Sequence, residues 1–235
     1  MASERDAIRN EIQVGRGLAA RLARQYGVLR AENATAELTM LGRKLASESA
    51  RPELRFIFGI LDTDEVNAYS CPGGYILFTR GALISLQTDG ELAFVIAHEI
   101  AHVALQHSGR FDQSSGWMDF VAGLIGGGMN VVNTMVRTTT DQLEETLLKN
   151  GREQGMEFTA DEAGLILAVS AGYGSSDALA YLRRLEMQTG TQQARTHPPA
   201  AARRSRLQAF AAEQGIMAYG QGGNVLQQIQ TEIRK

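Results

Sequence analysis

The stretch LAFVIAHEIAHVALQH, from Leu92 to His107, decides how the rest of the chain is interpreted. It is apolar on nearly every side and no glycine or proline interrupts it, which predicts a buried helix. His98 and His102 are four residues apart, so they share one helix face and both imidazoles can reach one metal ion. Glu99 is turned about 100° from His98 and can hold a water molecule at the metal instead of ligating the metal.

Burial argues against a chance grouping of these side chains on a surface helix. Two histidines and a carboxylate without partners in an apolar interior would cost several kcal/mol. A metal ion satisfies all three groups, and the borderline-soft Zn²⁺ suits nitrogen ligands. The pattern therefore predicts a zinc site.

Length and composition indicate an ordinary globular protein. The chain has 235 residues, of which 44% are hydrophobic and 21% charged. We expect one α+β domain, with N-terminal helices over 1–50, a catalytic core over 51–215 and a C-terminal tail over 216–235. The net charge of −3 and the pI near 5.9 give no support for nucleic-acid binding. Cys71 is the only cysteine, which excludes an internal disulfide.

Two segments bear on the location of the protein. The N-terminal sequence MASERD has no apolar region of the kind found in a signal peptide, so we expect the targeting segment to be absent from this chain. The stretch 120–136 is rich in glycine and free of charge, but it is shorter than the roughly 20 residues that a spanning helix needs. We predict that this stretch forms a buried or membrane-dipping hairpin, or a mobile flap beside the cleft. The membrane-dipping form would give the protein peripheral membrane contact.

Periodicity and turn residues predict the other elements. Asp89 is the predicted N-cap of the helix that carries His98, and Ser70 to Gly74 form a predicted turn. Helices are predicted over 4–31, 35–49, 80–85, 142–171, 176–188 and 200–214, and short strands over 54–61, 66–69 and 75–79.

The third metal ligand is expected to lie outside the helix that carries His98 and His102. A catalytic zinc normally has three protein ligands and one open position. His107 comes five residues after His102, which turns it off the ligand face, so it is interpreted as a surface residue or a charge at the helix C-terminus. The chain has only four histidines, which leaves a carboxylate or His197 as the third ligand.

The stretch REQGMEFTADEAG, from Arg152 to Gly164, resembles the glutamate-zincin signature E-x-x-x-A/S-D. The resemblance implies that Glu157 is the third ligand and that Asp161 orients a ligand histidine. Their spacing of four residues puts both carboxylates on one helix face, which suits these two roles.

Two further segments extend the resemblance. Residues 67–81 (NAYSCPGGYILFTRG) are similar to the N-A-x-x-x-P-G-G-x-I-x-x-T-x-G-L segment of the HtpX/Oma1/BepA-type gluzincins, which include the CaaX prenyl protease. Residues 196–203 are similar to the T-H-P-P-x-x-x-R element of the same family. The resemblance implies a mainly helical zincin fold of the α+β class, with a small β-sheet beside the helix that carries the HExxH motif.

The activity that this resemblance implies is that of a zinc metalloendopeptidase. Glu99 would take a proton from the zinc-bound water and pass it to the leaving amine. His197 stands on a rigid Thr-His-Pro-Pro element. It either latches the zinc or donates to the developing oxyanion, unless it is a surface residue that caps the following helix. Arg203 shares the oxyanion role or anchors the loop.

The implied partners are protein or peptide substrates, including misfolded proteins of the bacterial cell envelope. The implied location is the periplasm, with membrane association, and the implied role is protein quality control. By analogy with other zincins, an edge strand aligns an extended substrate by strand addition. The candidate edges are the segment with Asn67, Ala68 and Tyr69 and the segment that begins with Gly74 and Tyr75.

Two alternatives stay open on the sequence alone. A non-catalytic, membrane-associated or chaperone-like binding module would keep zinc as a structural staple, closed by four protein ligands with His197 as the fourth. A zinc hydrolase acting on a non-peptide ester or amide would use the same ligands.

Overall fold

The computed structural model describes residues 4–107, 154–187, 197–218 and 222–234. Within these ranges the chain is mainly helical with one small sheet, which confirms the predicted α+β class. The elements are α1 (Glu4–Tyr26), α2 (Glu32–Ala46), β1 (Ile57–Leu61), β2 (Ala68–Cys71), the 3₁₀ turn η1 (Pro72–Gly74), β3 (Tyr75–Thr79), α3 (Arg80–Ser85), α4 (Asp89–Ala104), α7 (Gln154–Ser170), α8 (Ser175–Glu186), α10 (Ala200–Glu213) and α11 (Val225–Ile233).

The three strands form a sheet in the order β1-β3-β2, in which β3 is central. β1 runs parallel to β3 and β2 runs antiparallel to it, with Cys71 opposite Tyr75. Because β3 pairs on both sides, the prediction that the segment beginning with Gly74 and Tyr75 offers an edge to a substrate is wrong. The predicted turn is also shorter than expected, because Ser70 and Cys71 pair with β3 and belong to β2.

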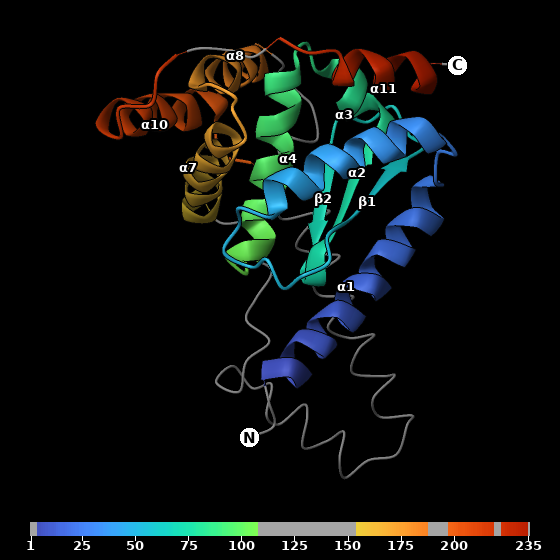
Figure 1. The fold of residues 1–235 in the computed structure, drawn as a ribbon. Helices are drawn as coiled ribbons and strands as arrows, with labels where there is room; N and C mark the ends of the chain where they lie inside the picture. The colour runs from blue at the N-terminus through green and yellow to red at the C-terminus, as the bar shows by residue number, and fades with distance from the viewer. Residues whose placement is uncertain (1–3, 108–153, 188–196, 219–221, 235) are drawn as a thin grey trace, which may run out of the picture.

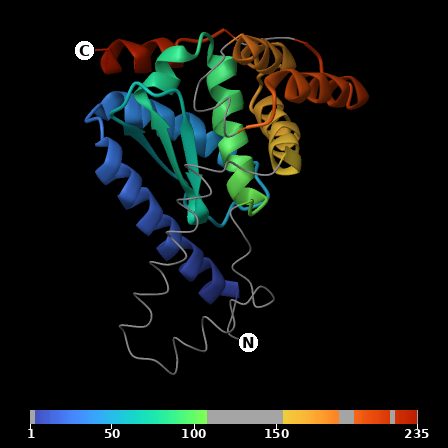
Figure 2. The ribbon, with the colours of Figure 1, turned by 180° about the vertical axis from the view of Figure 1, so that it is seen from behind.

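Helices cover the sheet on both faces. α2 crosses one face and α4 lies beside β2, and both pack with Phe58 and Phe78 (Figure 1). The view from behind shows the strands in front of α2 (Figure 2). α1 lies against the other face, where Leu18 and Leu22 pack with Tyr69. The side chains of β2 therefore alternate between α1 and α4.

The N-cap of α4 differs from the prediction by one residue. Thr88 has extended backbone angles, and its hydroxyl accepts a hydrogen bond from the Glu91 amide, as an N-cap does. Asp89 is the first helical residue, so its prediction as the cap is wrong. Its carboxylate instead accepts hydrogen bonds from the amides of Val225 and Leu226 at the start of α11, a partner more than 130 residues away.

α7 packs along α4 on the side away from the sheet, and α8 and α10 lie on the same side (Figure 1). This close approach depends on Gly164. A Cβ at Gly164 would lie 2.9 Å from the amide nitrogen of His98 and 3.0 Å from its Cα. Backbone atoms in a packed interior cannot yield to that contact without moving a helix, so glycine is what lets α7 reach α4 at this point.

No helix in the described ranges combines the length and apolar character needed to cross a membrane. The stretch 120–136 lies outside the described residues, and so does the part of the predicted helix over 142–171 that precedes Gln154. The predicted hairpin or flap and its membrane contact therefore stay predictions.

Replacing Gly164 by alanine should force α7 away from α4. We expect Gly164→Ala to lower the free energy of unfolding by about 1–3 kcal/mol, the usual effect of overpacking, as measured by urea denaturation. Gly155→Ala is the matched control on α7, because an added Cβ there meets no atom within 4 Å. That change should stabilise the protein by roughly 0.5–1 kcal/mol. Equal stability of the two variants would contradict the tight packing at Gly164.

Candidate metal centre

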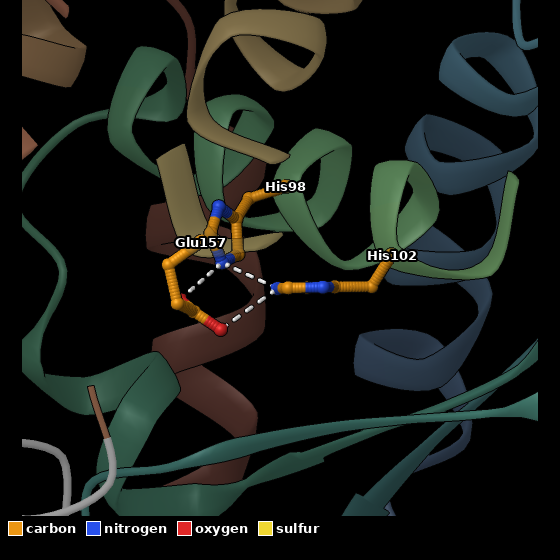
Figure 3. Close-up of side chains that lie close together, drawn as sticks. All are labelled: His98, His102 and Glu157. Atoms are coloured by element: carbon orange, nitrogen blue, oxygen red, sulfur yellow. Dashed lines mark hydrogen bonds and ion pairs between the residues drawn. The ribbon is translucent and has the colours of Figure 1, made fainter. Parts of the chain in front are cut away.

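Three side chains from two helices meet at one point inside the molecule. His98 and His102 project from consecutive turns of α4, and Glu157 projects from the first turn of α7 (Figure 3). The Nε2 atoms of the two histidines are 3.0 Å apart. Glu157 Oε2 lies 3.4 Å from His98 Nε2, and Glu157 Oε1 lies 3.3 Å from His102 Nε2. The three predicted ligands are therefore close enough to hold one ion.

The spacing of these atoms fits a shared metal ion. Tetrahedral bonds of about 2.0–2.1 Å separate neighbouring ligand atoms by about 3.3 Å, close to the distances found here. Glu157 is completely buried. Within the described residues neither of its carboxylate oxygens has a hydrogen-bond partner of normal geometry. Because an unsatisfied buried carboxylate is costly, the donor set fits a cation between the three side chains.

Burial and neighbouring charge act in opposite directions on these groups. Burial disfavours the ionised form of Glu157, but the surrounding imidazoles, that of His197 first, hold its pKa far below its usual range. Burial likewise lowers the pKa of His98, whereas Asp161 and Glu157 raise it to about 9. A metal ion that binds His98 must therefore compete with a proton for this imidazole.

Asp161 lies one helical turn after Glu157 and contacts the other side of the His98 ring. Its Oδ1 is 3.0 Å from His98 Nδ1. Arg203 on α10 donates to the same carboxylate through Nε at 2.8 Å and Nη2 at 2.6 Å. Burial alone would raise the pKa of Asp161, but this pairing lowers it to about 2. Arg203 is itself buried, so a chain of charged contacts joins α4, α7 and α10 at the site.

His197 approaches the same carboxylate from the residues just before α10. Its Nε2 is 3.5 Å from Glu157 Oε2, and its side chain is 14% exposed, so its interpretation as a surface cap is wrong. Burial lowers the pKa of His197 to about 4, which leaves the imidazole neutral at physiological pH. His98, Glu99, His197 and Arg203 line a pocket. The pocket is completed by Val66, Asn67, Ala68, Ala82, Phe94, Val95 and Tyr181.

Two contacts at the site were not predicted. Ser70 on β2 donates a 2.6 Å hydrogen bond to Glu99 Oε2, because the alternation of β2 turns its side chain toward α4. His107 stays off the ligand face, as predicted, but its Nδ1 lies 2.8 Å from His102 Nδ1. The only local signal for the first contact was a small polar residue two positions after Ala68. The contact between His107 and His102 forms because the chain folds back after α4, and the spacing of residues on a helix does not predict such a turn.

The model of Peptidase family M48 matches residues 32–211. The chain belongs to peptidase family M48. The matched range contains every residue described at the site, and it confirms the resemblance on which the third ligand was predicted. The family consists of metal-dependent peptidases, which agrees with the predicted hydrolysis of peptide bonds, while zinc itself stays a prediction.

Several proteins with assigned names are similar to this M48 chain. The chain is 27% identical over 158 residues to the putative beta-barrel assembly-enhancing protease of Vibrio cholerae. This match covers 62% of the chain and 31% of that protein. It is 30% identical over 161 residues to the mitochondrial metalloendopeptidase OMA1 of Arabidopsis thaliana, a match that covers 66% of the chain and 31% of that protein. It is 27% identical over 161 residues to the beta-barrel assembly-enhancing protease of Escherichia coli K12, 64% of the chain and 32% of that protein. The chain thus spans about a third of the length of these relatives.

The geometry predicts that Glu157→Gln abolishes metal binding. The neutral amide keeps the size of the side chain but removes the charged ligand, so two imidazoles alone would hold the ion. We expect zinc content after dialysis, measured by mass spectrometry, to fall from about one ion per chain to near zero. Glu162→Gln is the matched control on α7, because Glu162 pairs with the surface residue Arg206 at 2.7 Å. Equal zinc content in the wild type and Glu157→Gln would contradict the ligand assignment.

Proposed function

We propose that this M48 chain is a zinc-dependent metalloendopeptidase. The observation that carries the proposal is the convergence of His98, His102 and Glu157 beside the pocket that Glu99 lines. Three protein ligands with an adjacent open position are typical of a catalytic zinc site, whereas a structural site is closed by four. Zinc held there would polarise the scissile carbonyl and lower the pKa of a water molecule.

Glu99 is the residue that moves the proton. It follows His98 on α4, is 4% exposed and lines the pocket. The hydrogen bond from Ser70 restricts the orientation of its carboxylate. Glu99 takes a proton from the attacking water as a general base, and it then donates that proton to the leaving amine.

Asp161 and Arg203 position the ligands. Asp161 Oδ1 lies 3.0 Å from His98 Nδ1, although without the angle of a normal hydrogen bond. A proton kept on Nδ1 by this carboxylate leaves the lone pair on Nε2 available to the metal. Arg203 places two of its nitrogens on Asp161, which supports the anchoring role and not the oxyanion role that the sequence left open. The third nitrogen, Nη1, is 3.8 Å from Glu157 Oε2 and adds positive charge beside that ligand.

The edge strand β2 aligns the substrate. The amide of Asn67 donates to the hydroxyl of Thr79 and its carbonyl accepts from the Thr79 amide, so both backbone groups of Asn67 point toward β3. In an antiparallel ladder the next residue, Ala68, directs its backbone groups to the opposite side. The carbonyl of Ala68 therefore faces the edge that an extended peptide can join as a further strand, and Tyr69 again pairs toward β3. The apolar pocket walls beside Ala68 suit an apolar substrate side chain.

The substrates are proteins or peptides, including misfolded proteins of the bacterial cell envelope. The site of action is the periplasm, with peripheral membrane contact through residues 120–136, and the role is protein quality control. Support for this setting comes from the two relatives named beta-barrel assembly-enhancing proteases.

The proposal predicts that Glu99→Gln separates metal binding from catalysis. The amide cannot accept the proton, so casein hydrolysis should fall by at least about 10²-fold, whereas zinc content should equal that of the wild type. Glu162→Gln serves again as the control for loss of a carboxylate on a neighbouring helix. A wild-type protein that binds zinc but cleaves no peptide would instead support the zinc-stapled binding module, and hydrolysis of esters alone would support a non-peptide hydrolase.

His197 acts as a latch in this proposal. Its neutral imidazole is 3.5 Å from Glu157 Oε2. Pro198 and Pro199, which follow His197 directly, make the backbone of this segment rigid. An imidazole at this distance can move onto the open position of the ion, and bound there it would exclude the attacking water. The resting enzyme is then latent until the segment moves.

Removal of the latch should activate the enzyme. We expect His197→Ala to raise the rate of casein hydrolysis at matched zinc loading, because the fourth position is no longer occupied by an imidazole. A fall of about 10²–10³-fold in kcat would assign His197 to oxyanion stabilisation instead. An unchanged rate would remove both roles.

A further inference from the structure

The end of α4 turns the chain back toward the metal site. The amide of His107 donates to the carbonyl of His102 at 3.0 Å, and the amide of Gln106 donates to the carbonyl of Val103 at 3.1 Å. These two bonds form a Schellman motif, in which the residue after the cap is left-handed. Gln106 has φ 55°, a conformation that usually needs glycine and that strains a glutamine. The strained turn brings the His107 ring beside His102.

A line of polar contacts then connects the two ligand-bearing helices. His107 Nδ1 lies 2.8 Å from His102 Nδ1, with the ring centroids 4.9 Å apart. His107 Nε2 lies 3.3 Å from the hydroxyl of Thr159 on α7. That hydroxyl is 3.0 Å from the carbonyl of Met156 and 3.1 Å from the carbonyl of Gly155, in the turn that carries Glu157.

Metal binding would fix the direction of every hydrogen bond in this line. A neutral His102 that presents its Nε2 lone pair to the metal carries its proton on Nδ1, so it is the donor to His107. His107 can accept at Nδ1 only as the tautomer protonated at Nε2, and that proton goes to the Thr159 oxygen. Thr159 in turn donates its own proton to the backbone carbonyls of α7. Each donor thus has an acceptor of the right kind.

We propose that His107, supported by Thr159, is a positioning residue for the metal ligand His102. It holds the His102 ring in the ligating tautomer, as Asp161 does for His98, and it joins the end of α4 to the first turns of α7. The two ligand histidines are therefore held by different partners: a carboxylate for His98 and a neutral imidazole for His102. This inference rests on the proposed zinc site.

The experiment measures the zinc dissociation constant by competition with a chromogenic chelator, together with the visible spectrum of the cobalt-substituted protein. His107→Ala should weaken zinc binding by about 10–100-fold and alter the cobalt spectrum, because His102 loses the partner that orients it. In His107→Asn, Oδ1 occupies the place of Nδ1 and can accept the same proton. That variant should bind zinc more tightly than His107→Ala.

A matched pair tests the second half of the line. Thr159→Val removes the acceptor while keeping the shape, and it should weaken zinc binding, whereas Thr159→Ser keeps the hydroxyl and should match the wild type. The inference is overturned if His107→Ala and Thr159→Val bind zinc as the wild type does, or if His107→Asn is no better than His107→Ala. If the inference is overturned in this way, loss of zinc in Glu157→Gln under the same conditions would still support the assignment of Glu157 as a metal ligand. Wild-type zinc affinity in Glu157→Gln would instead mean that the site itself is wrong.

Discussion

A carboxylate with no exposed surface, that of Glu157, lies between the imidazoles of His98, His102 and His197 with a guanidinium nearby. Such a group is expensive to bury alone, and the elements around it can be understood as the means of holding it there. α4 supplies two imidazoles from one face, and α7 supplies the carboxylate. The ion that the site accommodates would neutralise a cluster that hydrogen bonds within the described residues leave unsatisfied.

The site also depends on elements outside the family match. The match covers residues 32–211, so α1 and α11 lie beyond it. On α1, the buried Glu11 accepts hydrogen bonds from Arg51 and from the Gly73 amide, and so fixes the turn between β2 and β3. On α11, Glu232 accepts from the Ala34 amide near the start of α2. With the contact from Asp89 to α11, these helices hold the sheet and α4 in place from both sides.

The sequence predicted what local geometry or family resemblance determines. The four-residue spacing of His98 and His102 indicates a shared helix face wherever the helix lies, and the resemblance supplied Glu157 and Asp161. The central place of β3 could not be predicted, because the order of strands depends on which strand edges meet in three dimensions.

The same limit applies to single side chains. Asp89 accepts hydrogen bonds at the start of a helix that begins 136 residues later. The local sequence pattern had instead predicted it as the N-cap of α4. His107 was expected to leave the site because it is off the ligand face. The left-handed Gln106 returns it to His102.

One zinc ion should bind between α4 and α7. Anomalous diffraction at the zinc edge, on crystals grown with stoichiometric zinc, would locate it. We expect one strong peak within bonding distance of the Nε2 atoms of His98 and His102 and of the Glu157 carboxylate. A peak elsewhere, such as at Cys71, with none between the two helices, would contradict it.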